Sequence, residues 1–156
     1  MARPIMANSC AAAASAAESR FRIDRPIDET RRTVVIALDR GAEGITADVA
    51  PTASERVRFL SAAVDAAAEV RDPAEIAHEI DKSDLVIMVA TSRLDVFTAA
   101  RIARICASLR VPVVGLVVGR PLERAAAVSA LRDHTVMLVV SETPSDLADI
   151  LSDLRA

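Results

Sequence analysis

The feature that most constrains the fold is an unbroken apolar run, Leu-Val-Ile-Met-Val-Ala, at residues 85–90. Asp84 precedes this run, and two hydroxyl residues, Thr91 and Ser92, follow it. The run is far shorter than the ~20 residues of a membrane span, and it does not alternate with polar residues as a half-exposed strand does. Because it is rich in β-branched residues, it predicts a strand buried on both faces at the centre of a parallel sheet.

Similar apolar runs at residues 33–38, 112–118 and 135–140 predict three more buried strands. Amphipathic helices are predicted between and after them, beginning near Asp72, Asp95, Leu122 and Asp146. Strands that alternate with helices predict a three-layer, Rossmann-like α/β domain, with a mainly parallel sheet and helices on both faces. We assign it to residues 32–156 and interpret residues 1–31, which are rich in Ala, Ser and Arg, as a disordered tail and linker.

Two segments between residues 40 and 70 are harder to assign. Residues 45–49 alternate between apolar and polar residues after Gly41 and Gly44, so we expect an edge strand entered through a turn, or a loop. Thr52 and Glu55 have the spacing of a capping box. The next apolar residues follow at helical spacing, which predicts a helix; they are Val57, Leu60, Val64 and Ala67.

Composition narrows the classes of partner. The chain has 2% aromatic residues, no Trp or Tyr, and a net charge of −3 with a pI near 5.4. Such a chain offers neither stacking platforms nor a basic surface, so we predict that it binds neither nucleic acid nor membranes. Two cysteines, Cys10 and Cys106, are too few for a disulfide framework and favour a cytoplasmic protein with reduced thiols.

The predicted topology locates a candidate binding site. Parallel sheets of this class bind ligands beyond the carboxyl ends of their strands. The residues that follow the predicted strands are polar, and arginines among them would suit a phosphate or carboxylate. The candidate ligand-binding residues are Asp39, Arg40, Gly41, Thr91, Ser92, Arg93, Gly119, Arg120, Ser141 and Thr143.

No motif identifies a catalytic or metal centre. Ser92 and Ser141 lack the Gly-x-Ser-x-Gly context of a nucleophile, and His78 and His134 stand alone. Residues 39–44, Asp-Arg-Gly-Ala-Glu-Gly, match no phosphate-binding loop. A nucleotide is therefore possible as a cofactor but is not supported by a phosphate-binding motif, and the cofactor is unknown.

Part of the chain resembles the nucleotide-binding domain of the tubulin/FtsZ superfamily. Asp-Leu-Val-Ile-Met-Val-Ala at residues 84–90 resembles the strand before that family's glycine-rich loop, and the alanine-rich residues 97–105 resemble the helix after it. The strands at 113–118 and 131–139 and the loop at 119–123 are also similar. The family's GGGTGTG loop would fall on residues 91–97, which hold no glycine. The resemblance therefore implies a degenerate domain with nucleotide binding reduced or lost.

These observations favour a non-catalytic Rossmann-like, FtsZ-like domain that acts through a protein partner or as a homo-oligomer. The alternative is a small-molecule or nucleotide-binding domain with an anion site at the carboxyl ends of the strands. An enzyme that uses Ser92 or Asp39 ranks lowest.

Overall fold

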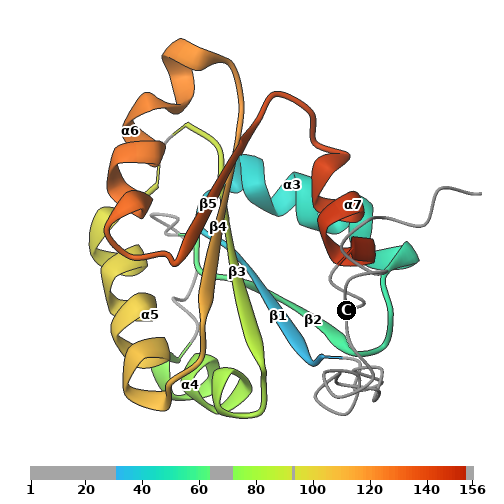
Figure 1. Ribbon diagram of the computed structural model, residues 1–156, viewed down its shortest axis with the longest axis vertical. Helices are drawn as coiled ribbons and strands as arrows, with labels where there is room; N and C mark the ends of the chain where they lie inside the picture. Colours follow the sequence, from blue (N-terminus) through green and yellow to red (C-terminus); the bar gives the residue numbers. More distant parts are fainter. Residues whose placement is uncertain (1–30, 64–71, 93, 154–156) are drawn as a thin grey trace, which may run out of the picture.

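The computed structural model describes residues 31–63, 72–92 and 94–153. A five-stranded, wholly parallel sheet lies at the centre (Figure 1), with the strand order β2-β1-β3-β4-β5. Its strands are β1 (Thr33–Ala37), β2 (Val57–Ser61), β3 (Leu85–Ala90), β4 (Val113–Val118) and β5 (Met137–Ser141). This 2-1-3-4-5 order is that of flavodoxin-like folds.

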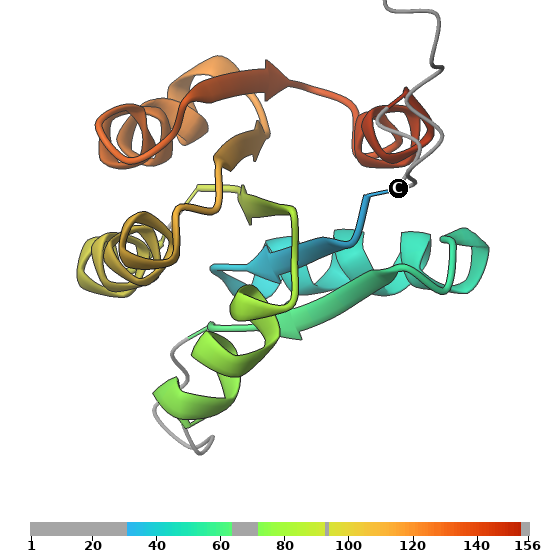
Figure 2. The ribbon, with the colours of Figure 1, turned by 60° about the horizontal axis from the view of Figure 1, so that its bottom comes forward.

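Helices cover both faces of the sheet, as Figure 2 shows. They are α3 (Arg40–Val49), α4 (Pro73–Asp81), α5 (Val96–Leu109), α6 (Pro121–Arg132) and α7 (Asp146–Asp153), with a short 3₁₀ turn, η1 (Ala50–Thr52), after α3. One core cluster lies between the sheet and α4, α5 and α6, and the second lies between the sheet and α3 and α7. The predicted three-layer, Rossmann-like fold class is confirmed.

The predicted core is confirmed at the centre of the sheet. Val34, Ile36, Ile87, Val89 and Leu116 are all buried. The strand that follows Asp84, β3, pairs with β1 on one side and with β4 on the other, so it is internal to the sheet. An unbroken apolar run identifies such strands well because both of their faces contact helices.

The segment after β1 was predicted incorrectly. Residues 40–49 form helix α3, not an edge strand or loop, and Asp39 is its N-cap. Ala42, Ile45 and Val49 face the core at helical spacing. Gly41 and Gly44 therefore lie inside a helix and do not form a turn.

The helix predicted after Thr52 is also wrong. Thr52 ends η1, and residues 57–61 form β2, the edge strand beside β1. Val57 and Leu60 are buried there, and their separation of three residues resembled helical periodicity. Val64 and Ala67 lie outside the described residues.

The last strand is less buried than predicted. It begins at Met137, two residues later than expected, and Leu138 is only partly buried. The reason is that β5 is the second edge of the sheet and pairs only with β4.

Among the described residues, no helix has the length and apolar character needed to cross a membrane. The predicted tail lies outside the described residues except for Arg31.

Candidate functional site

Asp39 is held by three hydrogen bonds at the carboxyl ends of the strands. It follows β1, and its side chain is nearly buried. Its carboxylate accepts hydrogen bonds from the Ala42 amide (2.8 Å), the Thr91 amide (2.6 Å) and the Thr91 hydroxyl (2.7 Å). The carboxylate thus both caps α3 and joins the end of β1 to the end of β3.

A second acidic side chain of α3 is also paired. The hydroxyl of Ser61, at the end of β2, donates a hydrogen bond to the carboxylate of Glu43. Sequence reasoning did not select Glu43 or Ser61, because α3 and β2 were both assigned incorrectly. The available signal was Asp39 as an N-cap followed by Glu43 in the first helical turn.

A third carboxylate, Asp95, occupies the N-terminus of α5. It accepts hydrogen bonds from the Phe97 amide (3.2 Å), the Thr98 amide (3.0 Å) and the Thr98 hydroxyl (2.5 Å). The pKa of Asp95 is lowered, and the hydrogen bond from the Thr98 hydroxyl is the largest cause. Burial of the carboxylate raises the pKa and offsets part of this effect. The hydrogen bonds from the Phe97 and Thr98 amides and the charge of Arg101 lower it further. The suspected tubulin/FtsZ resemblance placed that family's glycine-rich loop on residues 91–97. In the structure this segment contains the N-cap and the start of α5 instead.

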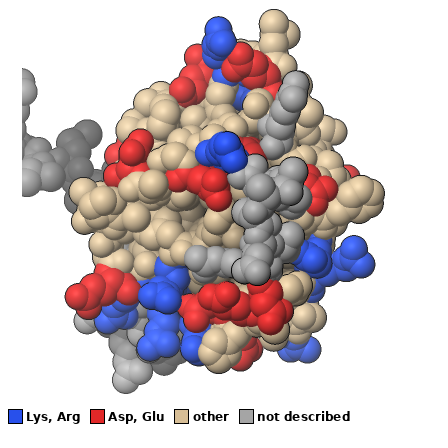
Figure 3. Space-filling model, turned by 180° about the vertical axis from the view of Figure 1, so that it is seen from behind, with Lys and Arg blue, Asp and Glu red and all other residues tan. Residues whose placement is uncertain are grey.

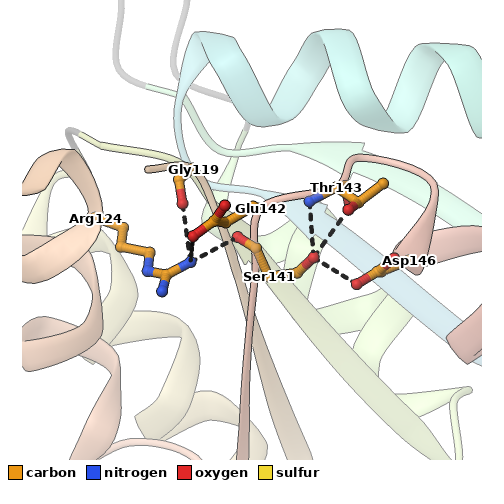
Figure 4. Close-up of polar contacts among 6 residues, drawn as sticks. All are labelled: Gly119, Arg124, Ser141, Glu142, Thr143 and Asp146. Atoms are coloured by element: carbon orange, nitrogen blue, oxygen red, sulfur yellow. Dashed lines mark hydrogen bonds and ion pairs between the residues drawn. The ribbon is translucent and has the colours of Figure 1, made fainter. Parts of the chain in front are cut away.

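A polar network joins the ends of β4 and β5 (Figure 4). The Arg124 guanidinium donates to the carbonyl oxygens of Gly119 (2.9 Å) and Ser141 (3.1 Å) and lies 3.9 Å from the Glu142 carboxylate. The Ser141 hydroxyl accepts from the Thr143 amide (2.9 Å) and donates to the Asp146 carboxylate. Arg124 therefore fixes the turn after β5 and is not directed at open solvent.

The structure brings together some of the predicted site residues and leaves others apart. Asp39 lies against Thr91, and Gly119, Ser141 and Thr143 share the network around Arg124. Arg40 and Gly41 lie in the first turn of α3, and Arg120 forms a surface ion pair with Glu123 (2.6 Å). Ser92 is half-buried, and Arg93 lies outside the described residues.

This arrangement suits structural bonding better than ligand capture. The amides at the N-termini of α3 and α5, which would attract a phosphate, already bind the carboxylates of Asp39 and Asp95. Within the described ranges, no group of three or more His, Cys, Asp or Glu side chains could hold a metal ion. In the view from behind, acidic and basic side chains are interspersed over the surface (Figure 3).

The edge strand β5 presents a different kind of surface. Met137 and Val140 in β5 are large apolar side chains that are 60% and 41% exposed, and Val136, immediately before the strand, is 78% exposed. Residues 134–141 contain no Lys, Arg, Asp or Glu. No strand in the described part of the chain pairs with the outer edge of β5, and no helix crosses it (Figure 2).

The other edge strand, β2, shows how sheet edges are normally protected. Arg58, the second residue of β2, is exposed, and its guanidinium forms an ion pair with Glu79 of α4 (3.4 Å). A charge in an edge strand discourages pairing with another chain. β5 lacks this protection, so the two edges of one sheet differ in chemistry.

Comparisons with solved structures return distant similarities. No family model and no curated protein matches the chain. It is similar to the receiver domain of a Francisella response regulator, at 14% identity over 80% of this chain and 96% of that one (TM-score 0.44). It is also similar to a Burkholderia pseudomallei protein described as pilus assembly-related, at 16% identity over 85% and 95% (TM-score 0.47). A third similar structure is the receiver domain of a Pseudomonas aeruginosa sensor histidine kinase with a coordinated magnesium ion, at 14% identity over 80% and 97% (TM-score 0.45). At these identities the similarity concerns the fold alone.

The suspected resemblance to the tubulin/FtsZ superfamily is wrong. The three similar structures above are two receiver domains and a pilus assembly-related protein, not tubulin or FtsZ domains. The strand–helix spacing that suggested it is shared by many parallel α/β domains. The FtsZ-like description is therefore withdrawn.

Proposed function

We propose that this chain is a non-catalytic protein-interaction domain and that the β5 side of the sheet binds its protein partner. The observation that carries the proposal is the exposure of Met137 and Val140 on an edge strand without charged residues, and of Val136 immediately before it. Isolated exposed apolar residues are ordinary, but three within five residues along one open sheet edge are typical of an interaction surface.

The carboxyl edge of the sheet also supports this proposal, because its polar side chains are bonded to the protein itself. Asp39, Glu43, Asp95 and Asp146 all bind groups of the protein itself, and Arg124 binds two carbonyl oxygens. A small ligand at this edge would have to displace these bonds before making its own, which lowers its affinity.

Photo-crosslinking tests this function. A photoreactive amino acid replaces Val140 in the full chain, and a matched variant carries it at Arg58 on the guarded edge strand β2. In the cells that produce the protein, we expect covalent adducts with a polypeptide from position 140 and far fewer from position 58.

A ligand screen in the same study tests the alternative of an anion site at the carboxyl edge. Thermal melts are recorded with nucleotides, sugar phosphates and Mg²⁺. A ligand present at 100 times its dissociation constant stabilises the fold by ~2.7 kcal/mol, which a melt detects. Such a shift, abolished in Asp39→Asn and accompanied by no adduct at position 140, would contradict the proposed function.

A further inference from the structure

We propose that β5 pairs with β5 of a second copy of this chain, antiparallel and across a two-fold axis, so that two five-stranded sheets join into one. This inference rests on the proposed function and names the partner. A two-fold axis brings the same surface of both copies together, so the strand must be complementary to itself in shape, polarity and charge.

The first argument is the polarity pattern along the strand. In an antiparallel register centred on Leu138, Val136 of one copy lies opposite Val140 of the other, and Met137 lies opposite Val139. Every directly opposed pair from residue 136 to residue 140 is then apolar, and such cross-strand pairs are the unit of sheet stabilisation. No buried charge has to be desolvated, because residues 134–141 contain none.

The second argument is the position of the exposed side chains on the two faces. Leu138 packs against the core cluster beneath α4, α5 and α6, whereas Val139 packs against the cluster beneath α3 and α7. Val140 shares the face of Leu138, because side chains alternate along a strand, and Val136, immediately before β5, joins that face when pairing extends the strand by one residue. Pairing would therefore extend the α6 side of the core across the axis with three apolar residues from each copy.

The third argument is the surface of α6 next to this strand. A groove of about 470 Å³ runs between α6 and β5 and is lined by residues that include Ala125, Ser129 and Val140. Between Arg124 and Arg132, α6 has no charged residue, and its exposed positions there are Ala125, Ala126 and Ser129. An axis perpendicular to the sheet places both copies of α6 on the same side, where small side chains permit close approach of the two helices.

The fourth argument is charge at the ends of the strand. In the proposed dimer, the segment before β5 of one copy, which holds Arg132, Asp133 and His134, runs towards Glu142 of the other. The Glu142 side chain is 64% exposed, and its ion pair with Arg124 is long at 3.9 Å. Arg132 and Glu142 thus offer one pair of opposite charges at each end of the interface, which favours the antiparallel arrangement.

Mass measurement tests the assembly. Sedimentation of the full chain over a wide range of concentration should show a species of twice 16.5 kDa. Val136→Lys and Val140→Lys each introduce a charge on the edge strand, which opposes pairing. We expect each to raise the dimer dissociation constant by at least about tenfold, equivalent to about 1.4 kcal/mol.

The matched control is Phe97→Lys. Phe97 is 85% exposed at the N-terminus of α5. The substitution therefore removes an exposed apolar side chain from a part of the surface other than β5. We expect this variant to dimerise like the parent protein. Circular dichroism melts of all three variants identify any loss of folding, and Val136, at 78% exposure, is the safer of the two strand positions.

Disulfide trapping tests the register. In a Cys10→Ser background, Val136→Cys and Val140→Cys chains are mixed and oxidised. Directly opposed antiparallel residues lie within the Cα separation that a disulfide spans, whereas a residue and its own copy, offset by four positions, do not. We expect a covalent dimer in the mixture and much less from either variant alone.

Three outcomes would overturn the dimer. If the chain stays monomeric and position 140 crosslinks to a different protein, self-pairing is wrong and the proposed function survives. If the chain stays monomeric and position 140 crosslinks to residues 1–30 of its own chain, the edge is covered internally. If it stays monomeric and position 140 forms no adduct with any polypeptide, both proposals fail.

Discussion

At the scale of single residues, Asp39 determines how closely the chain can pack at the end of β1. Its carboxylate holds the Thr91 side chain directly over the first turn of α3. A Cβ atom added at Gly41 would lie 2.5 Å from the Thr91 Oγ1 and 2.9 Å from its Cγ2. Gly41 therefore leaves room for a contact between two strands, and it does not provide a turn.

The two glycines of α3 give a matched pair of variants. Gly41→Ala should destabilise the fold by about 1–3 kcal/mol, because Thr91 must move and its bonds to Asp39 must distort. Gly44→Ala meets nothing within 4 Å and should stabilise the helix by about 0.5–1 kcal/mol. Urea denaturation of both variants measures the difference. Equal effects would show that the contact with Thr91 does not restrict position 41.

Cys106 provides a prediction about reactivity. It is buried in the core beneath α5, and desolvation raises the pKa of its thiol to about 11. Because the thiolate is the reactive form, the Cys106 thiol of a Cys10→Ser variant should react very slowly with a disulfide reagent at pH 8. Addition of denaturant should make the same thiol react fully and quickly. Rapid reaction without denaturant would contradict the burial of this side chain.

At the scale of elements, the sequence predicted those strands and helices whose environment is uniform. β1, β3 and β4 are apolar throughout because each lies between two other strands and beneath helices on both faces. α4 and α5 were located by the N-caps Asp72 and Asp95. A local pattern suffices where one kind of contact dominates.

The errors fall where two environments meet. β2 is an edge strand in which buried Val57 and Leu60 enclose an exposed arginine, so its pattern has no clear period of two. α3 contains two glycines, which indicate a turn when the contact with Thr91 is not known. Thr91 is held there by a hydrogen bond to Asp39, 52 positions away in sequence, so local reasoning could not find the contact.

The cap of α5 yields a pH-dependent prediction. Asp95→Ala should cost about 0.5–2 kcal/mol at pH 7, because the amides of Phe97 and Thr98 lose their acceptor. The folded-state pKa of Asp95 is lowered, so its stabilisation is present above the unfolded-state value of about 3.8 and is lost as the pH falls through the folded-state value. The stability difference between the two proteins should therefore shrink below about pH 4. Melts from pH 7 to pH 2 measure it, and a constant difference would contradict the assignment.

At the scale of the whole molecule, the topology of the sheet explains which parts of the site were predictable. The carboxyl ends of parallel strands gather at one edge, so the proximity of Asp39 to Thr91 and of Gly119 to Ser141 follows from the strand order. The strand order does not predict which side chains form hydrogen bonds with one another, such as Asp39 with Thr91, because these bonds depend on distances in the folded chain. The exposure of β5 likewise depends on which strand ends the sheet, which the apolar run at residues 135–140 could not reveal.

The core clusters on the two faces of the sheet lead to a final prediction: the domain folds without residues 1–30. Apolar clusters on both faces of the sheet are built from residues between Val34 and Leu151, and Arg32 is tied to β3 by a hydrogen bond from its amide to the Asp84 carboxylate (2.9 Å). Residues 1–30 have the composition of a segment that cannot bury enough apolar surface to offset its ordering entropy. A chain that begins at Arg31 should therefore melt within about one degree of the full chain, since the loss of even 1 kcal/mol would lower Tm by several degrees.

Calorimetry of both chains at equal concentration checks this prediction. The variant Ile87→Asp serves as an unfolded reference, because an unpaired carboxylate in that core costs several kcal/mol. If the shorter chain melted several degrees lower, residues 1–30 would have to contribute to the folded domain, and the domain boundary at residue 32 would be wrong.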